Sequence, residues 1–379
     1  MRECKRNGCR VLLLTAEKLR DADWPRESLA DTFYLPEEIL LADIVQAVTH
    51  LARTEKIDRI VALDEYDMET ASTLREHLRI PGMGLTTMRY FRDKLAMRMK
   101  ALDRHVRVPD FVPVFNRADI GYYLEHVPGP WVLKPRQEAS AIGIKKIHAA
   151  EELWPALEQL GDKQSSFLLE KFVPGEVYHV DSVVSENKVV FANVSKYGKP
   201  PMNVAQGGVF TTFTVARSSG EESGLRQINE ELIAALGLIR GVAHAEFIKA
   251  HADGNFYFLE CAARVGGAYI NEMVEAATGL NLWREWARIE VAGGDGSYQL
   301  PETREEYAGV ILSLARQENP DTSGYNDPEV FLRIRKHHHA GLILRSRDPE
   351  RIPSLLEAYA RRFAEEFLAV EPPREKPTA

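Results

Sequence analysis

A pair of glutamates placed symmetrically about a turn constrains this sequence more than any other feature. Residues 242–249 and 256–260 have the apolar character of strands, and Asp253-Gly254 between them is a turn signal. If the strands fold back as a hairpin, Glu246 and Glu260 are equidistant from Asp253 and face each other with Cβ atoms about 5 Å apart. Two like charges at that distance predict a cation between them, and Mg²⁺ is the natural candidate because it binds one or two carboxylates together with substrate phosphates. Two alternatives stay open: one glutamate is solvated at a strand edge, or the register slips by one residue and separates the pair.

The residues that flank this pair extend the predicted site. His244 falls on the same strand face as Glu246, where it either contacts the site or is a satisfied histidine within the sheet. Arg264 follows the second strand into a loop, in which Gly266 and Gly267 allow a ligand to approach the backbone closely. A guanidinium is a planar, permanently charged fork, so Arg264 is expected to bind a phosphoryl group or a carboxylate; an ordinary surface salt bridge is the alternative.

Two lysines and a small-residue loop form a candidate phosphate site. Lys94 lies in F-R-D-K-L, and Lys134 ends the apolar strand W-V-L-K-P. The stretch A-S-A-I-G at residues 139–143 follows, and its backbone N–H groups are suited to covering phosphates. Either lysine taken alone is more simply a solvated surface charge. The sequence has no G-x-x-x-x-G-K-[ST] motif and no dinucleotide fingerprint after its first apolar run, so a nucleotide would bind in another way.

Taken in order, these motifs resemble those of ATP-grasp enzymes. The series consists of Lys94, W-V-L-K-P, the A-S-A-I-G loop, F-L-L-E-K-F-V-P-G and the two glutamates ending in R-V-G-G. It spans nearly the whole chain, and its later half is similar to the carboxylate–amine ligase branch, which includes amino-acid and dipeptide ligases. The resemblance implies an α/β and α+β fold with an N-terminal parallel α/β lobe at 1–92, a small central lid lobe at 93–172, a larger C-terminal antiparallel-sheet lobe at 173–370 and a disordered tail at 371–379.

The resemblance also implies how ATP is bound. Lys94 and Lys134 would hold its phosphates, and the loop around Ser140 would close over them. The backbone of a hinge between two lobes would read adenine, and this hinge consists of Glu170, Lys171, Phe172 and Val173. Glu176, just after the hinge, is the candidate for binding ribose.

For the metal and the substrates, the resemblance points to the hairpin and the loop after it. Glu246 and Glu260 would hold Mg²⁺, with Mn²⁺ as an alternative ion. Arg264 would stabilise an acyl phosphate and its transition state. Gly266 and Gly267 would line the pocket for the acceptor.

The sequence departs from the ATP-grasp pattern in three places. Glu138 and Ala139 stand where relatives often have more flexible residues. Val177 occupies the position of a common ribose-binding glutamate, so ribose is expected to meet Glu176 or, alternatively, Asp181. Ala262 replaces a familiar metal-binding asparagine, which puts the coordination of a second metal ion in doubt.

The function that this resemblance implies is ATP-dependent ligation. A small carboxylate, expected to be an amino acid, would be activated as an acyl phosphate and coupled to an amine, with release of ADP and phosphate. One alternative is an ATP-grasp carboxylase or formate-activating enzyme. The other, motivated by Ala262 and the unusual loop, is a nucleotide-binding protein without ligase activity.

Composition limits the partners and the compartment. The chain has 379 residues, enough for more than one packed lobe, and its formal charge of -8 argues against nucleic-acid binding. No run of about 18 apolar residues occurs, so no membrane partner is expected. Cys4, Cys9 and Cys261 form no zinc-like or disulfide pattern, and a reducing cytoplasm is the expected compartment. A homodimer is a reasonable expectation, because two-fold assemblies are the commonest.

Hydrophobic patterning predicts the elements around these motifs. Three apolar runs, at residues 11–14, 33–35 and 60–63, occur together with one helical stretch. This succession indicates a parallel α/β unit. Later strands are expected at 131–134, 167–170, 180–184 and 188–194, and helices at 151–160, 221–236 and 282–291. Three features are interpreted as structural: Cys261 as a small buried residue, Trp283 and Trp286 as packing residues, and His337 to His339 as part of a strand.

Overall fold

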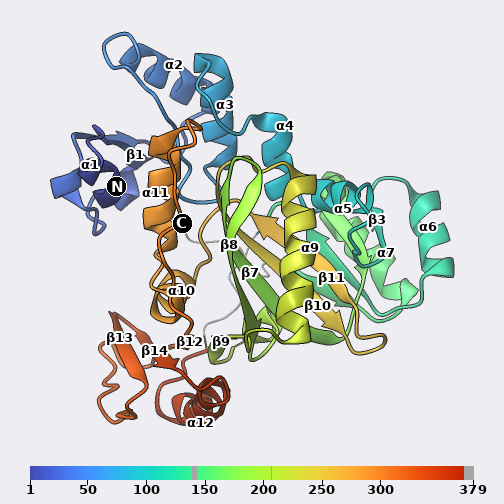
Figure 1. The fold of residues 1–379 in the computed structure, drawn as a ribbon. Coiled ribbons are helices and arrows are strands. Elements are labelled where there is room, and N and C mark those ends of the chain that lie inside the picture. Colours follow the sequence, from blue (N-terminus) through green and yellow to red (C-terminus); the bar gives the residue numbers. More distant parts are fainter. Residues whose placement is uncertain (139–142, 206, 371–379) are drawn as a thin grey trace.

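The computed structural model describes residues 1–138, 143–205 and 207–370. Within them, the strands fall into three sheets that follow one another along the chain (Figure 1). A two-stranded parallel sheet comes first, a four-stranded antiparallel sheet follows, and an eight-stranded antiparallel sheet occupies most of the second half. This confirms the predicted combination of a parallel α/β lobe with a small and a large antiparallel lobe. The tail predicted at 371–379 lies outside the described residues.

The N-terminal region pairs β1 (Leu12–Ala16) with β2 (Asp31–Leu35) in parallel. Its helical segments are α1 (Arg2–Arg6), η1 (Glu17–Leu19), η2 (Arg26–Ser28), α2 (Leu41–Leu51), α3 (Met68–Leu78), α4 (Leu85–Met88) and η3 (Arg89–Phe91). Ile44 and Val48 on one face of α2 pack against Leu74 of α3 in a small separate core.

The apolar run at 60–63 is not a strand, contrary to the sequence pattern. Most of its side chains still pack inward, because Ile60 packs against two apolar clusters and Ala62 is buried, but Leu63 is 36% exposed. The Ile60 carbonyl accepts from Nε of Arg75 in α3 at 2.8 Å and not from a strand. A short buried segment thus carries the same apolar signal as a strand without having a partner strand.

The four-stranded sheet has the order β3-β6-β4-β5. Its strands are β3 (Phe111–Pro113), β4 (Trp131–Pro135), β5 (Lys145–Ile147) and β6 (Phe167–Lys171). Helix α5 (Lys94–Leu102) precedes it, and α6 (Arg117–His126), α7 (Ala150–Leu160) and the 3₁₀ segment η4 (Gly161–Ser166) connect its strands. Ile120 of α6 and Leu153 of α7 join Leu133 and Leu169 of the strands in one core. The strands predicted at 131–134 and 167–170 are confirmed.

The eight-stranded sheet has the order β11-β10-β7-β8-β9-β12-β14-β13. Its strands are β7 (Gly175–Ser185), β8 (Lys188–Tyr197), β9 (Phe210–Thr214), β10 (Gly241–Ala250), β11 (Phe256–Ala262), β12 (Tyr307–Leu314), β13 (Val330–Lys336) and β14 (His339–Ser346). The associated helices are α8 (Pro201–Ala205), α9 (Gly220–Leu236), α10 (Ile270–Thr278), α11 (Leu282–Ala292) and α12 (Arg351–Glu366).

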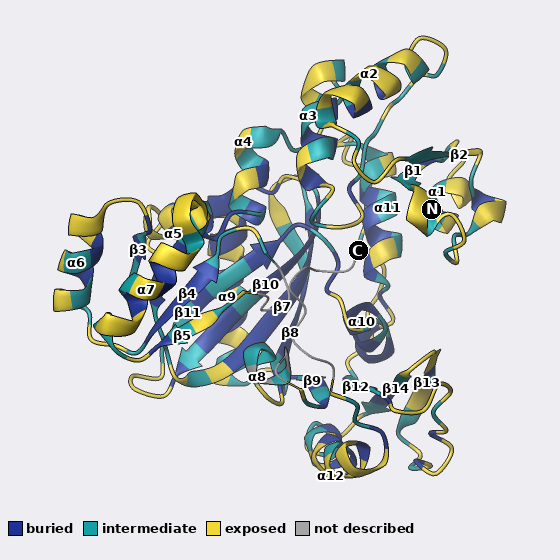
Figure 2. Ribbon diagram, turned by 180° about the vertical axis from the view of Figure 1, so that it is seen from behind, coloured by how far each residue is buried: buried dark blue, intermediate teal, exposed yellow. Residues whose placement is uncertain are grey.

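Helices cover both faces of this sheet, which explains why its central strands are almost continuously buried (Figure 2). Successive residues of a strand point to opposite faces. Val184 of β7 belongs to the core that includes Leu232 of α9, whereas the adjacent Val183 belongs to the core that includes Met273 of α10. Helix α12 closes a third core against β12 and β14, near the end of the sheet.

Three features interpreted as structural have different outcomes. Cys261 is only 1% exposed, so the prediction of a small buried residue is confirmed. Trp286 is buried and stacks on Trp283 with ring centroids 5.9 Å apart, but Trp283 is 41% exposed and is not a core residue. His337 and His338 form the turn between β13 and β14 and do not lie within a strand, because His338 has a φ of 54° that ends the extended backbone.

Among the described residues, no helix combines the length and the apolar character needed to cross a lipid bilayer.

Candidate active site

The two glutamates of the hairpin meet through a β-bulge. β10 and β11 pair so that Glu246 lies opposite Glu260, as the sequence predicts. Nearer the turn the register differs by one residue, because Phe247 pairs with Phe258. The extra residue, Leu259, is taken up in the bulge. Without it Glu246 would lie opposite Leu259 and the two carboxylates would be separated, which is the slipped register that the sequence left open.

A fully buried arginine holds the bulge and links it to the small sheet. Arg98 of α5 donates to the Leu259 carbonyl, and its Nε and Nη2 donate to Oε2 of Glu170 at 3.1 and 3.0 Å. Lys134 donates to the other oxygen of Glu170. Burial, together with the positive charges of Arg98 and Lys94, lowers the pKa of Lys134 to about 8, although Glu170 opposes the shift. The cluster therefore contains a lysine whose charge is easily lost.

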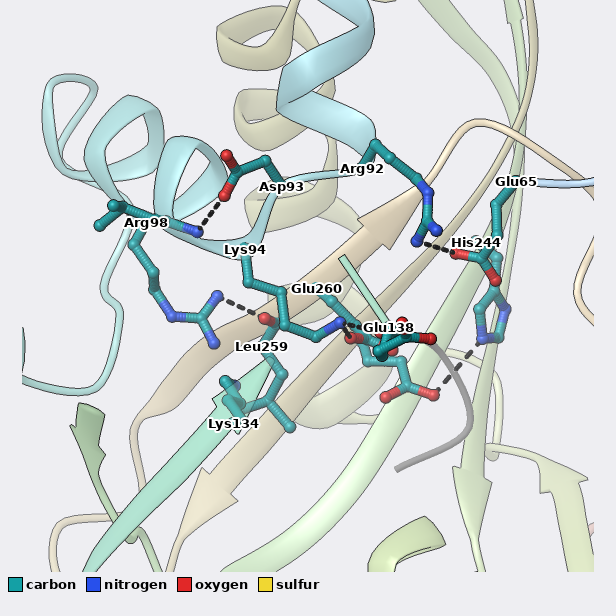
Figure 3. Close-up of polar contacts among 12 residues, drawn as sticks. Glu65, Arg92, Asp93, Lys94, Arg98, Lys134, Glu138, His244, Leu259 and Glu260 are labelled. Atoms are coloured by element: carbon teal, nitrogen blue, oxygen red, sulfur yellow. Dashed lines mark hydrogen bonds and ion pairs between the residues drawn. The ribbon is translucent and has the colours of Figure 1, made fainter. Parts of the chain in front are cut away.

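Lys94 begins α5 and reaches the hairpin (Figure 3). Its Nζ lies 3.0 Å from Oε2 of Glu260 and donates to the Glu138 carbonyl at 2.6 Å. Asp93 caps the helix by accepting from amides of its first turn, and its carboxylate also pairs with Arg136 just after β4. Burial raises the pKa of Glu260, but the positive charges of Lys94 and its neighbours outweigh that effect and lower it. The two predicted phosphate-binding lysines thus belong to one charged cluster at the junction of the two antiparallel sheets.

Arg264, predicted to face the transferred phosphoryl group, is paired with Glu65. Its Nη2 lies 2.7 Å from Oε1 of Glu65, and its Nη1 donates to the Val265 carbonyl at 2.9 Å. Glu65 precedes α3 and also lies 3.8 Å from Nη1 of Arg92 (Figure 3). Sequence reasoning missed Glu65. The available signal is its position in L-D-E, directly after the apolar run at 60–63.

A buried polar network lies behind Glu246. The Tyr197 hydroxyl donates to Oε1 of Glu246 at 2.7 Å, and Nε2 of His244 lies 3.5 Å from the same oxygen. Nδ1 of His244 and Nδ1 of His179 both bond the Asp181 carboxylate, at 2.8 and 2.7 Å. Burial alone would lower the pKa of His244, but the charge and hydrogen bond of Asp181 raise it to about 10. His244 therefore contacts the site and is also a satisfied buried histidine.

The same network bears on the ribose candidates. Asp181 is fully buried and holds two histidines, so it does not serve as the alternative ribose contact. His179, Asp181 and His244 lie close enough for a metal, with ligand atoms within 4.8 Å of one another, but hydrogen bonds already occupy them. Glu176 is exposed on β7, and its Oε1 lies 2.5 Å from Nζ of Lys196. A ribose contact by Glu176 would require that ion pair to open.

In the predicted adenine hinge, two backbone N–H groups donate to backbone carbonyls, and a third is left to bind a ligand. The N–H of Lys171 donates to the Asp110 carbonyl at 2.8 Å, and that of Phe172 donates to the Pro130 carbonyl at 2.9 Å. Among the described residues, the N–H of Val173 has no backbone partner. If the hinge reads adenine through an amide, Val173 is the residue with a donor to offer.

Ser140 lies outside the described residues, as does most of the loop predicted to cover the phosphates. Its role in closing over ATP stays a prediction.

A cavity of about 420 Å³ opens beside the loop that follows Arg264. The Gly266-Gly267 pair, the N-terminal ends of α10 and α11 and the β13–β14 hairpin line it. Gly266 packs tightly, because a Cβ there would lie 2.9 Å from Nδ1 of His244 and 3.0 Å from Oδ1 of Asp181. A Cβ at Gly267 would meet nothing within 4 Å in the described part of the chain. Gly266 thus lets the loop approach the buried network, while Gly267 borders open space.

Comparison with known proteins assigns this architecture. Residues 127–272 match the ATP-grasp domain family. The central part of this chain therefore matches an ATP-grasp domain. An L-amino acid ligase from Bacillus licheniformis superposes on it with a TM-score of 0.73, over 98% of this chain and 95% of that chain, at 20% sequence identity. The ADP complex of N5-carboxyaminoimidazole synthetase from Staphylococcus aureus gives a TM-score of 0.72, over 95% and 92% of the two chains, at 15% identity. At these identities the likeness establishes the fold alone, and it confirms the predicted ATP-grasp fold.

Sequence relatives of this chain include ligases of amino acids. The L-arginine-specific L-amino acid ligase of Bacillus subtilis is 25% identical over 269 residues, which cover 69% of this chain and 65% of that protein. The D-alanine–D-alanine ligase of Prosthecochloris aestuarii is 28% identical over 177 residues, which cover 43% of this chain and 47% of that protein. The aligned region spans less than two thirds of either relative's own length.

Proposed function

We propose that this protein is an ATP-grasp enzyme that acts as an ATP-dependent carboxylate–amine ligase, with a small carboxylate, most simply an amino acid, as donor. The observation that carries the proposal is the opposed pair Glu246 and Glu260, with Lys94 bonded to the second glutamate and Arg264 in the loop that follows. This set combines carboxylates for a cation with positive groups for phosphate and for an acyl phosphate. The names of the amino-acid ligases among its relatives support the donor class.

The glutamate pair suits a hard divalent cation. Tyr197 and His244 contact only Oε1 of Glu246, and Lys94 contacts only Oε2 of Glu260. Within the described residues, each carboxylate therefore keeps one oxygen without a protein partner. Mg²⁺, or Mn²⁺ in its place, is the expected ion; when bound it would neutralise charge on the ATP phosphates.

The charged cluster suits a triphosphate. Lys94 and Lys134 would contact its phosphates. Burial lowers the pKa of Lys134, and the negative charge of a bound phosphate would oppose that effect and favour the charged lysine. Glu170 would hold Lys134 in place while the backbone of the following hinge, through Val173, reads adenine. The loop around Ser140 would cover the phosphates.

The reaction we propose has two steps. A donor carboxylate oxygen attacks the γ-phosphorus of ATP, the bond from phosphorus to the bridging oxygen breaks, and ADP leaves with its electron pair. An amine nitrogen then attacks the acyl carbon, a C–N bond forms, and phosphate leaves with the electron pair of the broken C–O bond. The protons lost by the ammonium pass to phosphate and solvent. Arg264, oriented by its ion pair with Glu65, would stabilise the charge of the phosphoryl group in both steps.

The organisation of the chain is part of the proposal. We assign residues 1–92 to the N-terminal domain, 93–172 to the linker and lid and 173–370 to the large subdomain. The lid would hinge at 170–173 and exclude water from the acyl phosphate. The cytoplasm is the proposed compartment, with a homodimer as the proposed assembly and Glu176 as the proposed ribose contact.

The deciding experiment measures ADP release with Mg·ATP across amino acids offered singly and in pairs. Hydroxylamine is added in parallel, because it traps an acyl phosphate as a hydroxamate. The proposal expects turnover that requires particular acids and is lost in Glu260→Gln and Arg264→Ala. Glu302→Gln, at an exposed loop position, is the matched control and should behave as wild type. Turnover with bicarbonate or formate alone, or ATP binding without turnover, would refute amino-acid ligation.

A further inference from the structure

Four arginines gather where three neighbouring strands of the large sheet begin or end. β9, β12 and β14 are adjacent, and their antiparallel pairing brings the end of β9, the start of β12 and the end of β14 together (Figure 1). The segments at these strand ends supply the arginine cluster, which consists of Arg217, Arg304, Arg345 and Arg347. The proposed reaction uses none of these residues.

Three members of the arginine cluster share one carboxylate. Nε of Arg304 and Nε of Arg345 lie 3.9 and 3.6 Å from Oε2 of Glu306. Nε of Arg347 lies 3.6 Å from the other oxygen. These distances are longer than those of N–H···O hydrogen bonds, so Glu306 attracts the guanidinium groups without satisfying their donors. Among the described residues, no other acid lies within 4.0 Å of the cluster.

The fourth arginine has a buried donor without a partner. Nη2 of Arg217 donates to the Glu306 carbonyl at 2.9 Å, and its guanidinium lies 5.7 Å from the centre of the Tyr307 ring. Within the described part of the chain, its Nε is buried and has no hydrogen-bond acceptor. Because buried polar groups in folded proteins are nearly always hydrogen-bonded, this donor indicates a place for an acceptor from outside the chain.

A structural role accounts for only part of the arginine cluster. Nη2 of Arg304 donates to the Glu275 carbonyl at 3.2 Å, near the C-terminal end of α10, where a positive charge is favourable. Arg345 lies over the Phe331 ring, 4.4 Å from its centre, and Arg347 is 92% exposed. In the described residues, neither of these two guanidinium groups donates a hydrogen bond to the protein. Their terminal N–H groups therefore remain for a ligand.

Helix α10 separates the arginine cluster from the candidate active site. The N–H of Arg304 donates to the Thr278 carbonyl at 2.7 Å, at the C-terminal end of this helix. The Gly266-Gly267 loop lies before its N-terminal end. A helix of 9 residues is about 13 Å long, so a small anion at the cluster is a different ligand from one bound beside Arg264.

The chemistry of the arginine cluster suits phosphate. A guanidinium is a planar fork that stays charged and can bind two oxygens of one phosphate. Four positive groups around one carboxylate repel one another, and a doubly charged anion offsets that repulsion more fully than a singly charged one does.

We propose that the arginine cluster binds a small anion that carries phosphate, either inorganic phosphate or a phosphate monoester. Arg345 and Arg347 supply the terminal donors, Arg217 supplies the buried donor, and Glu306 keeps the guanidinium groups together. The inference goes beyond the proposed ligase function and does not depend on it.

Isothermal titration calorimetry with inorganic phosphate and with glycerol phosphate, at constant ionic strength, measures this binding and distinguishes the two sources. Arg345→Gln and Arg347→Gln are each expected to weaken it about tenfold, because each removes a charge-assisted contact. Arg347 is almost fully exposed, so its replacement leaves the core intact even if Arg345→Gln does not fold. Arg104→Gln, at an exposed position after α5, is the matched control and should bind phosphate as the wild type does.

Lys94 and Lys134 offer phosphate another place to bind, so the titration is repeated with Lys94→Gln. The inference expects this variant to keep the binding that Arg347→Gln loses. Equal phosphate binding by wild type, Arg345→Gln and Arg347→Gln, or equal binding of the dicarboxylate succinate, would indicate an adventitious ion only and overturn the inference. Loss of binding in Lys94→Gln alone would assign the ion to the ATP site and overturn it too. Neither result bears on the ligase proposal, which the ADP and hydroxamate measurements test.

Discussion

Replacing Glu170 by glutamine tests the buried charge cluster that links the two antiparallel sheets. In the wild type one oxygen of Glu170 accepts from Arg98 and the other accepts from Lys134. These side chains are 6%, 0% and 7% exposed, respectively, so water does not screen them. Glutamine keeps the shape of the side chain but removes its charge, and its amide N–H groups then point at one of the two cations.

The expected loss of stability follows from this burial. Removing one partner of a buried ion pair costs about 3–5 kcal/mol, because the remaining charge stays desolvated. The lower end applies here, since Lys134 has a pKa of about 8 and can release its proton. Holding Lys134 neutral at pH 7 costs about 1.4 kcal/mol, which limits the penalty. We therefore expect the free energy of unfolding of Glu170→Gln at pH 7 to be about 3 kcal/mol lower than that of the wild type.

The pKa of Lys134 also sets the direction in which this stability difference changes with pH. As the pH rises above 8 the wild-type Lys134 becomes mostly neutral, so less electrostatic attraction to Glu170 remains to be lost. The difference between variant and wild type should shrink by about 1 kcal/mol between pH 7 and pH 9. Arg98 remains charged throughout, so a deficit persists at the higher pH.

Urea unfolding followed by tryptophan fluorescence at both pH values measures this difference. Glu158→Gln, at an exposed position of α7, is the matched control and should stay within about 0.5 kcal/mol of wild type. If Glu170→Gln also stays within that limit at both pH values, the buried-charge reasoning is refuted. A larger deficit at pH 9 than at pH 7 would contradict the role assigned to Lys134.

Three further predictions concern the proposed reaction. Tyr197→Phe removes the hydrogen bond to Glu246, so the Mg²⁺ concentration that gives half-maximal ADP release should rise about tenfold, with the rate at saturation unchanged. A Mg²⁺ titration identical to that of the wild type would contradict this. The ATP concentration for half-saturation should rise above about pH 8, where Lys134 loses its charge, whereas Lys134→Arg should show a flatter profile; equal profiles would rule the lysine out. Glu65→Gln leaves Arg264 without its partner, so steady-state kinetics should show kcat about tenfold lower with an unchanged KM for ATP; wild-type kcat would exclude this orienting role.

Local sequence patterns predicted much of the secondary structure. The hairpin at 242–260, the helices at 151–160, 221–236 and 282–291 and the central strands are all present, because apolar periodicity and turn residues act over a few neighbouring positions. The same local reasoning failed at 60–63, where apolar residues pack against the core without a partner strand, and at 337–338, where the chain turns. In both places packing and pairing depend on segments that a short window does not include.

The candidate site was predicted less completely than the fold. Lys94, Lys134, Glu246, Glu260 and Arg264 are recognisable in the sequence because their order resembles that of ATP-grasp motifs. No sequence motif marks the residues by which the N-terminal region and the buried network contact the site. The ion pair between Glu65 and Arg264 joins residues 199 positions apart, and Tyr197 meets Glu246 from a different strand pair.

The sequence by itself determined that this chain contains a hairpin with two acidic residues equidistant from its turn, since the strand pattern and the Asp253-Gly254 signal are local. It did not determine that the two carboxylates face each other. That arrangement depends on the bulge at Leu259, whose carbonyl is held by Arg98, a residue 161 positions away that is fully buried against Glu170. A one-residue change of register moves every following side chain to the other face of the strand. The placement of Glu260 opposite Glu246 therefore belongs to the tertiary structure, in which Arg98 bonds the bulge from a distant part of the chain.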